Sequence, residues 1–189
     1  MTNRTNQKRP PQKPGPRAPR VAEMLRVDHA GEYGAVAIYR GQRAVFDALP
    51  GKAAIAAKIA EMEDGEAAHL EAFDKLLVER RVRPTLLSPF WNVAGFGLGA
   101  ATALMGEKAA MACTAAVEDV IEKHYGEQAE DLATSEPELA ATITQFREDE
   151  LEHKHTAEDE GAHDAPGYRL LSAVIGAGCR VAIKVAEKV

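Results

Sequence analysis

Apolar side chains recur three and four residues apart along most of the chain, a spacing that is typical of amphipathic helices. The spacing predicts helices over residues 20–48 and 52–82, a shorter one within 85–106, and a fourth over 107–133. A fifth begins after Ser135 and runs to about residue 161, and the last spans 168–189. Hydrophobic residues make up 46% of the sequence and aromatic residues only 5%, which favours helices packed through small side chains. The pattern therefore predicts an all-α protein.

Turn-forming residues separate these helices. Leu49, Pro50 and Gly51 form a predicted turn after the first helix, and Pro84 is expected to end the second. Ser135 is expected to cap the helix that follows it, because Pro137 and Glu138 then fall in the first turn.

One long segment, Thr85 to Gly106, carries no formal charge. Its length would allow a membrane span, but Pro89, Asn92 and the glycines at 95, 97 and 99 make it a weak one. We therefore expect a short helix that lies against the bundle or in a bilayer surface. The last segment, 168–189, is apolar with scattered Arg and Lys, which fits a helix with one side at a membrane surface.

The charge is unevenly distributed. The net charge is -6, yet the segment 1–20 holds six basic side chains and no acidic one, which leaves 17 of the 23 Lys and Arg against all 29 Asp and Glu in the rest. An acidic body argues against nucleic acid as the main partner. Residues 1–19 are rich in Pro and Gly and are predicted to be a disordered tail, so that residues 20–189 form one domain. A mitochondrial presequence is the alternative for this tail.

The two cysteines, Cys113 and Cys179, form no CxxC motif and lie in apolar helical surroundings, which suits buried thiols in a reducing compartment. No segment has the pattern of a secretory signal. We expect neither cysteine to bind a metal.

The candidate metal ligands are pairs of a Glu and a His three residues apart on a helix. This spacing places both side chains on one face. The chain contains this spacing four times: Glu66/His69, Glu150/His153, Glu152/His155 and Glu160/His163. Because the chain has 20 Glu and 6 His, one such pair is weak evidence, and the alternative is a surface pair or a satisfied buried pair.

The helix face separates the four pairs. Apolar residues stand four and seven positions before Glu66, and the same is true of Glu150. The same offsets from Glu152 hold Glu148 and Gln145, which places that pair on a polar face. The pair Glu160/His163 lies at a helix end and carries little weight.

Each selected pair follows a helix that carries a further inward Glu. The separation of Glu32 from Glu66 nearly equals that of Glu118 from Glu150, so the first two helices repeat in the fourth and fifth. Four-helix proteins with two metal ions use this set, a Glu from each of two helices and a Glu-x-x-His pair from each of the other two. Four carboxylates and two imidazoles without a thiolate suit iron or manganese.

Four stretches resemble a known family, the ferritin-like di-iron hydroxylases of ubiquinone biosynthesis that act on demethoxyubiquinone. They are Val27–Ala35 (VDHAGEYGA), Glu66–Leu70 (EAAHL), Ala112–Glu118 (ACTAAVE) with His124 and Tyr125 beyond it, and Phe146–His153 (FREDELEH). The likeness runs from about Arg20 to the end of the chain and leaves residues 1–19 outside.

The resemblance implies a ferritin-like four-helix bundle with two additional apolar, membrane-associating helices. It places metal ligands at Glu32, Glu66, His69, Glu118, Glu150 and His153, the set that the helix faces select. It implies a monooxygenase with two iron ions that hydroxylates the C6 ring position of demethoxyubiquinone with O2, with NADH as the electron source. His124 and Tyr125 are expected to hydrogen-bond near the site or to help electron transfer; the alternative is a packed tyrosine and a surface histidine.

A substrate with a polyprenyl tail lies in the bilayer, so the resemblance also implies peripheral membrane association. The expected place is the cytoplasmic face of the cell membrane, or the matrix face of the mitochondrial inner membrane in a eukaryote. Phe90, Trp91 and Phe96 would suit an interfacial anchor, and ordinary core packing is the alternative. Further partners would be other proteins of ubiquinone biosynthesis, and oligomers are compatible with the pattern.

Two other functions compete with this one. A ferritin-like iron oxidase or store would assemble into cages with a polar surface, and a manganese catalase would need no membrane affinity. A purely structural bundle would leave four inward carboxylates without a purpose. Flotation with membranes and a peroxide assay separate these alternatives.

Overall fold

The computed structural model describes residues 18–188, which form a bundle of α-helices. The elements are α1 (Ala18–Phe46), α2 (Ala53–Arg80), α3 (Ser88–Leu104), α4 (Glu107–Leu132), α5 (Pro137–Asp159), the 3-10 turn η1 (Ala162–Asp164) and α6 (Tyr168–Ala186). No strand occurs among these residues, so the predicted all-α class is confirmed.

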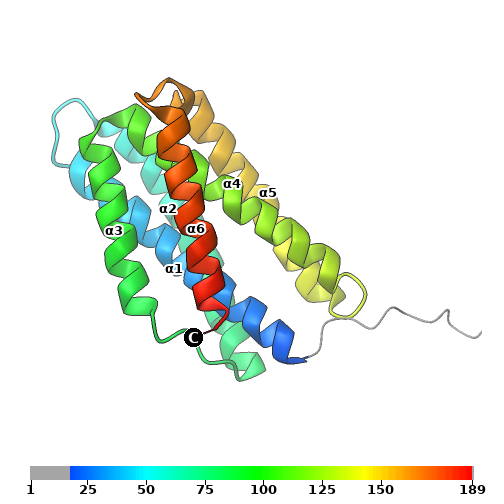
Figure 1. Cartoon of the computed structure of the whole chain (residues 1–189). Helices are drawn as coiled ribbons and strands as arrows, with labels where there is room; N and C mark the ends of the chain where they lie inside the picture. The colour runs from blue at the N-terminus through cyan, green and yellow to red at the C-terminus, as the bar shows by residue number, and fades with distance from the viewer. Residues whose placement is uncertain (1–17, 189) are drawn as a thin grey trace, which may run out of the picture.

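The bundle consists of two helix hairpins with one extra helix packed on each. Helices α1 and α2 form the first hairpin, and α4 and α5 form the second. Helix α3 packs along α1, and α6 packs mainly along α4 (Figure 1). The faces that carry the candidate residues are therefore enclosed by the four helices of the two hairpins.

The first two helix ends differ from the predicted ones. Helix α1 already includes Pro19, which was expected to precede it, because proline lacks only an N–H that the first turn does not use. Residues 1–17 of the predicted tail lie outside the described residues. Helix α2 ends before Pro84 because Arg81 adopts a left-handed conformation (φ 55°), and the N–H groups of Arg81 and Val82 close the last turn.

The predicted cap at Ser135 is wrong. The N–H groups of Ser135 and Glu136 both donate to the Leu132 carbonyl, so Ser135 belongs to the turn that ends α4. Glu136 is the cap residue of α5, and its carboxylate accepts two hydrogen bonds from Arg80 of α2. Pro137 and Glu138 do lie in the first turn of α5, as expected.

Helix α3 spans 17 residues and is longer than the short helix that Pro89 and the glycines suggested. Its glycines allow its backbone to approach α1 closely. A Cβ on Gly99 would collide with the Ile38 carbonyl oxygen, and a Cβ on Gly95 would lie 2.6 Å from the carbonyl oxygen of Gly34. These glycines are therefore packing positions and not helix breaks.

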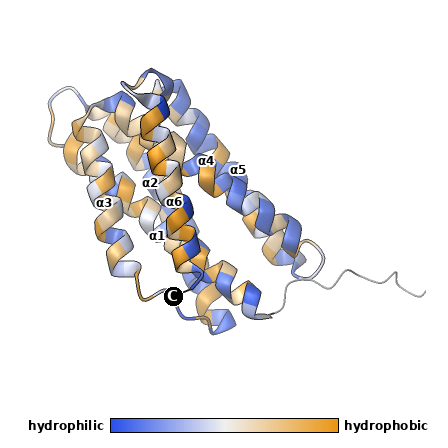
Figure 2. Ribbon diagram, in the orientation of Figure 1, coloured by the Kyte–Doolittle hydropathy of each residue, from blue (hydrophilic) through white to orange (hydrophobic). Residues whose placement is uncertain are grey.

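Helices α3 and α6 also carry large apolar side chains on the outside of the bundle. The most exposed are Phe90, Val93 and Leu104 in α3, and Leu170, Val174 and Val181 in α6. Figure 2 shows hydrophobic residues along both helices and mostly hydrophilic ones along α5. Among the helices of residues 18–188, none combines the length and apolar character that crossing a membrane requires.

The glycine contact between α1 and α3 gives a test of this packing. Gly99→Ala is expected to lower the free energy of unfolding by about 1–3 kcal/mol, because the backbone of Ile38 must move to admit the methyl group. Gly97→Ala is the matched control, since nothing lies within 4 Å of a Cβ there, and it should leave stability equal or up to about 1 kcal/mol higher. Urea unfolding measures both, and equal stability of the two variants would contradict the close approach.

Candidate metal centre

The six residues selected from the sequence come from all four helices of the two hairpins and meet between them. Glu32 lies on α1, Glu118 on α4, and the two Glu-x-x-His pairs on α2 and α5. The four carboxylic side chains and His69 are buried, and His153 is 13% exposed. Glu152 and His155 point to solvent instead, so the register that favoured Glu150 over Glu152 is confirmed.

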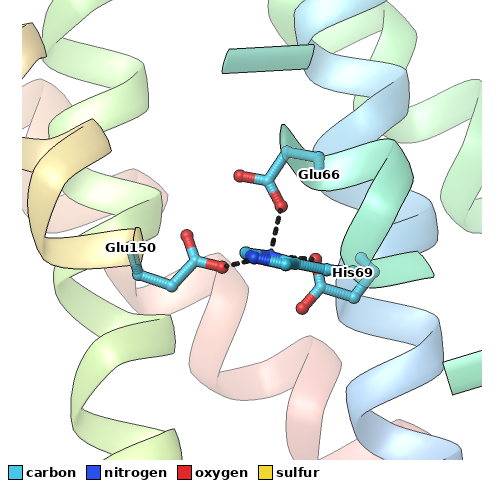
Figure 3. Close-up of side chains that lie close together, drawn as sticks. Glu66, His69 and Glu150 are labelled. Carbon is cyan, nitrogen blue, oxygen red and sulfur yellow. Dashed lines mark ion pairs between the residues drawn. The ribbon is translucent and has the colours of Figure 1, made fainter. Parts of the chain in front are cut away.

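The six residues divide into two overlapping groups. Glu32, Glu66, His69 and Glu150 place one ligand atom each within 4.8 Å of one another, and Glu66, Glu118, Glu150 and His153 form the second group by the same measure. Glu66 and Glu150 belong to both groups. Figure 3 shows both carboxylates pointing towards the His69 ring, and they lie 3.7 Å (Glu66) and 3.3 Å (Glu150) from its Nδ1. The arrangement offers two neighbouring metal positions with two shared carboxylates.

The site fits cations because its inward atoms lack partners. Oxygens of all four carboxylates and Nδ1 of His69 are buried without a hydrogen-bond partner among the described residues. Unpaired buried carboxylates cost several kcal/mol each, so an arrangement of four needs positive charge between them. The donor set of oxygen and nitrogen suits iron or manganese.

The pKa values of the metal-free site show the same conflict. Burial raises the pKa of Glu32 and of Glu118 well above the usual range, and the charges of Glu66 and Glu150 add to the effect. Glu66 shows the opposite shift. Burial alone would raise its pKa, but the hydrogen bond with His153 and the nearby imidazole of His69 lower it to about 2.

The two histidines take up protons in compensation. Burial lowers the pKa of each imidazole, but the neighbouring Glu150 and Glu66 outweigh it and raise the pKa to about 10 for His69 and about 9 for His153. In the metal-free protein the protonated imidazoles therefore supply the positive charge that metal ions would supply when bound.

Two tyrosines hold the outer carboxylates across the hairpins. Tyr39 of α1 donates to Glu118 of α4 at 2.7 Å, and Tyr125 of α4 donates to Glu32 of α1. Tyr125 was singled out from the sequence and is buried at the site, whereas Tyr39 was missed. The signal was present, because each tyrosine stands two helical turns after the glutamate on its own helix.

His124 lies next to the cluster and does not contact it within the described residues. Its Nε2 is 3.2 Å from Oδ1 of the buried Asp28 and 2.8 Å from Nε2 of Gln128. Gln128 also donates to Asp28 at 2.8 Å. His124 is thus not a free surface group; it belongs to a polar group, with Asp28 and Gln128, that joins α1 to α4.

Two cavities flank the site on different sides. An apolar cavity of about 340 Å³ is bordered by α1, α3, α4 and α6, and its wall includes Gly31 and Val117, the neighbours in sequence of Glu32 and Glu118. A more polar cleft of about 530 Å³ lies between α2 and α5, with His69 and His153 in its wall. The polar cleft therefore reaches the two histidines, whereas the apolar cavity borders the two helices that carry Glu32 and Glu118.

The profile of one protein family, described as "Ubiquinone biosynthesis protein COQ7", matches residues 19–186. The chain belongs to this family. The match spans all six helices and all six candidate ligands.

Several relatives cover most of the chain. The 3-demethoxyubiquinol 3-hydroxylase of Rhodospirillum rubrum is 50% identical over 186 residues, which is 98% of this chain and 86% of the relative. The mitochondrial NADPH-dependent 3-demethoxyubiquinone 3-hydroxylase of Homo sapiens is 49% identical over 172 residues, 89% of this chain and 77% of the relative. The mitochondrial 5-demethoxyubiquinone hydroxylase of Saccharomyces cerevisiae is 41% identical over 182 residues, 88% of this chain and 77% of the relative. The expectation that the chain is an oxidoreductase of this family is confirmed.

Metal content distinguishes the inward from the outward glutamate. Glu150→Ala is expected to lose most bound metal, because both metal positions share this carboxylate. Glu152→Ala, two residues away and exposed, should retain the metal content of the unchanged protein. Elemental analysis of both variants, purified alike, gives the comparison, and similar metal content in the two would contradict the arrangement.

A second test uses the pH dependence of the metal-free protein. The folded pKa of Glu118 lies above its ordinary value of about 4.5, so folding takes up a proton; the associated stability is present below pH 4.5 and is lost as pH rises. Glu118→Gln removes this loss and still accepts the Tyr39 hydrogen bond. Thermal unfolding with a chelator present should therefore show a shallower decline of stability above pH 4.5 in the variant. A decline as steep as in the unchanged protein would show that Glu118 carries no such penalty.

Proposed function

We propose that this chain is a di-iron monooxygenase that hydroxylates demethoxyubiquinone in ubiquinone biosynthesis. In the reaction, one oxygen atom of O2 enters the ring at the position that lacks its methoxy group, C6, and the other leaves as water with two electrons and two protons. The names of the relatives support the substrate. The observation that carries the proposal is the cluster of four buried carboxylates and two imidazoles.

The proposed ligands are the six residues of the cluster, and Glu66 and Glu150, which belong to both groups, would serve both iron positions. Iron held there would supply the O2 activation and electron transfer that protein side chains cannot. The protein contributes position. Tyr39 and Tyr125 each keep one oxygen of an outer carboxylate occupied, so that the other oxygen is directed into the site.

The apolar cavity is the proposed place for the quinone. Its wall consists of aliphatic side chains, glycines, Cys179 and Trp91, which suit a ring with a prenyl tail better than a polar metabolite. It adjoins the two helices that carry Glu32 and Glu118, and its wall includes their sequence neighbours Gly31 and Val117, which supports this placement of the ring. Aliphatic walls also keep bulk water from the ring.

Peripheral membrane association is part of the proposal. The exposed apolar side chains of α3 and α6 lie on the two helices that border this cavity, and α6 adds cationic residues, among them Arg169 and Lys184. A lipid-dissolved substrate could thus enter from the bilayer surface. Flotation with lipid vesicles tests this placement, and a protein that stays with the aqueous fraction would contradict it.

NADH is the proposed electron source, as the family resemblance implies. The mammalian relatives are named NADPH-dependent, so the comparison of the two nucleotides is part of the test. His124 precedes Tyr125 in the chain and forms a polar group with Asp28 and Gln128. This group and Tyr125 are proposed to assist proton or electron transfer towards Glu32.

The decisive experiment combines metal counting with product analysis. The purified, detergent-solubilised chain is supplied with a short-tailed demethoxyquinone, isotopically labelled O2 and either NADH or NADPH. We expect about two irons per chain and a product that carries one labelled oxygen atom, seen by mass spectrometry.

Glu150→Ala is the negative control for this reaction, and Glu152→Ala is its matched control that should retain activity. Two bound metals without the hydroxylated product would exclude the substrate and leave an iron oxidase or a catalase, which a peroxide assay separates. A folded protein that binds no metal would exclude the proposed centre itself.

A further inference from the structure

The two halves of the site repeat along the sequence. Glu32 and Tyr39 recur in the second hairpin as Glu118 and Tyr125, and Glu66 and His69 recur there as Glu150 and His153, each with the same internal spacing. The repeat fails at the residue before each Glu-x-x-His pair. That residue is Asp149 on α5 and Gly65 on α2.

Asp149 reaches across to the histidine of the other hairpin. Its Oδ2 lies 3.1 Å from Nε2 of His69, while Nδ1 of the same ring faces Glu150 at 3.3 Å. Gln145, one turn earlier on α5, donates to the other oxygen of Asp149 at 3.0 Å. The aspartate is therefore held in place, and it requires a proton on Nε2, which leaves the Nδ1 lone pair free to bind a metal.

His153 has the same inward orientation without such a partner. Its Nδ1 lies 3.0 Å from Glu66, and its ring lies over Gly65, where a Cβ would be only 3.0 Å from Nε2. Within residues 18–188, no hydrogen bond to Nε2 of His153 is present, and both His153 and Gly65 line the polar cleft between α2 and α5. The ring therefore fills the space that the side chain of a second aspartate at position 65 would need.

We propose that Asp149 is a positioning residue for His69 alone, and that Gly65 leaves His153 open, so the two metal positions differ in affinity. The metal position that uses Glu32 and His69 is the tighter one. The position that uses Glu118 and His153 is the one that exchanges through the cleft, because its imidazole N–H meets water there. This inference rests on the metal centre of the proposed function and does not depend on the quinone.

The test is a manganese(II) titration of the full chain after metal removal, followed by the EPR signal of free manganese. The unchanged protein should bind two ions in two steps of different affinity. Asp149→Ala should weaken the tighter step about 10–100-fold, the usual effect of losing the hydrogen-bond partner of a ligating histidine. Asp149→Asn keeps an oxygen that accepts from Nε2 and should recover part of the loss.

Gly65→Ala addresses the other position. The methyl group would displace the His153 ring, so this variant should weaken the second step and leave the first. In the double variant Asp149→Ala/Gly65→Ala the two losses should add, since they concern different ions. Glu152→Gln is the control, because Glu152 borders the same cleft and has no hydrogen bond with either ring among the described residues.

Nitrogen-15 NMR of the zinc-loaded protein supplies a readout that misfolding would not imitate. The Nε2–H proton of His69 should exchange slowly with water, and that of His153 rapidly. Asp149→Ala should bring His69 to the rapid rate while the metal-free variant keeps its melting temperature, since the Asp149 side chain is 38% exposed.

Manganese steps that stay within about twofold in Asp149→Ala, or equal exchange rates for the two rings, would overturn the inference and leave the metal centre standing. A failure of the unchanged protein to bind two ions would overturn the proposed centre as well. The two failures are therefore distinguishable.

Discussion

Four carboxylic side chains lie buried within a few ångströms of one another, and the surrounding side chains compensate for their charge. Glu32, Glu66, Glu118 and Glu150 are each at most 1% exposed, and their oxygens lack enough protein donors. In the metal-free chain the pKa values of the two imidazoles are raised, and the protonated imidazoles reduce the repulsion between the carboxylates. The helix faces around the site are apolar and exclude water. The carboxylates therefore attract cations more strongly than they would in water.

Hydrogen bonds that run from one hairpin to the other hold these charged side chains in position. Tyr39 and Tyr125 each hold the glutamate of the opposite hairpin, and Asp149 on α5 holds His69 on α2. Each hairpin thus orients ligands that the other supplies. The metal positions exist only when the hairpins dock, which couples the site to the fold of the whole domain.

The surroundings of the site divide the approaches by polarity. On the side of α3 and α6, glycines let helices pack closely around an apolar cavity, and large apolar side chains cover the outside. On the side of α2 and α5, a polar cleft reaches the two histidines. A lipid-like substrate and small polar species would therefore not compete for one opening, which is consistent with the proposed reaction.

Local patterns along the chain were enough to predict the helices and the inward register. Apolar neighbours at helical offsets separated Glu150 from Glu152, because burial follows the periodicity of a single helix. Helix ends were predicted less well: Ser135 belongs to the preceding turn, and a left-handed Arg81 ends α2 before Pro84. The bond from Tyr39 to Glu118, the reach of Asp149 to His69 and the position of His153 over Gly65 emerged from the folded chain alone. These contacts join separate helices, and their geometry depends on how the hairpins dock, which no local pattern encodes.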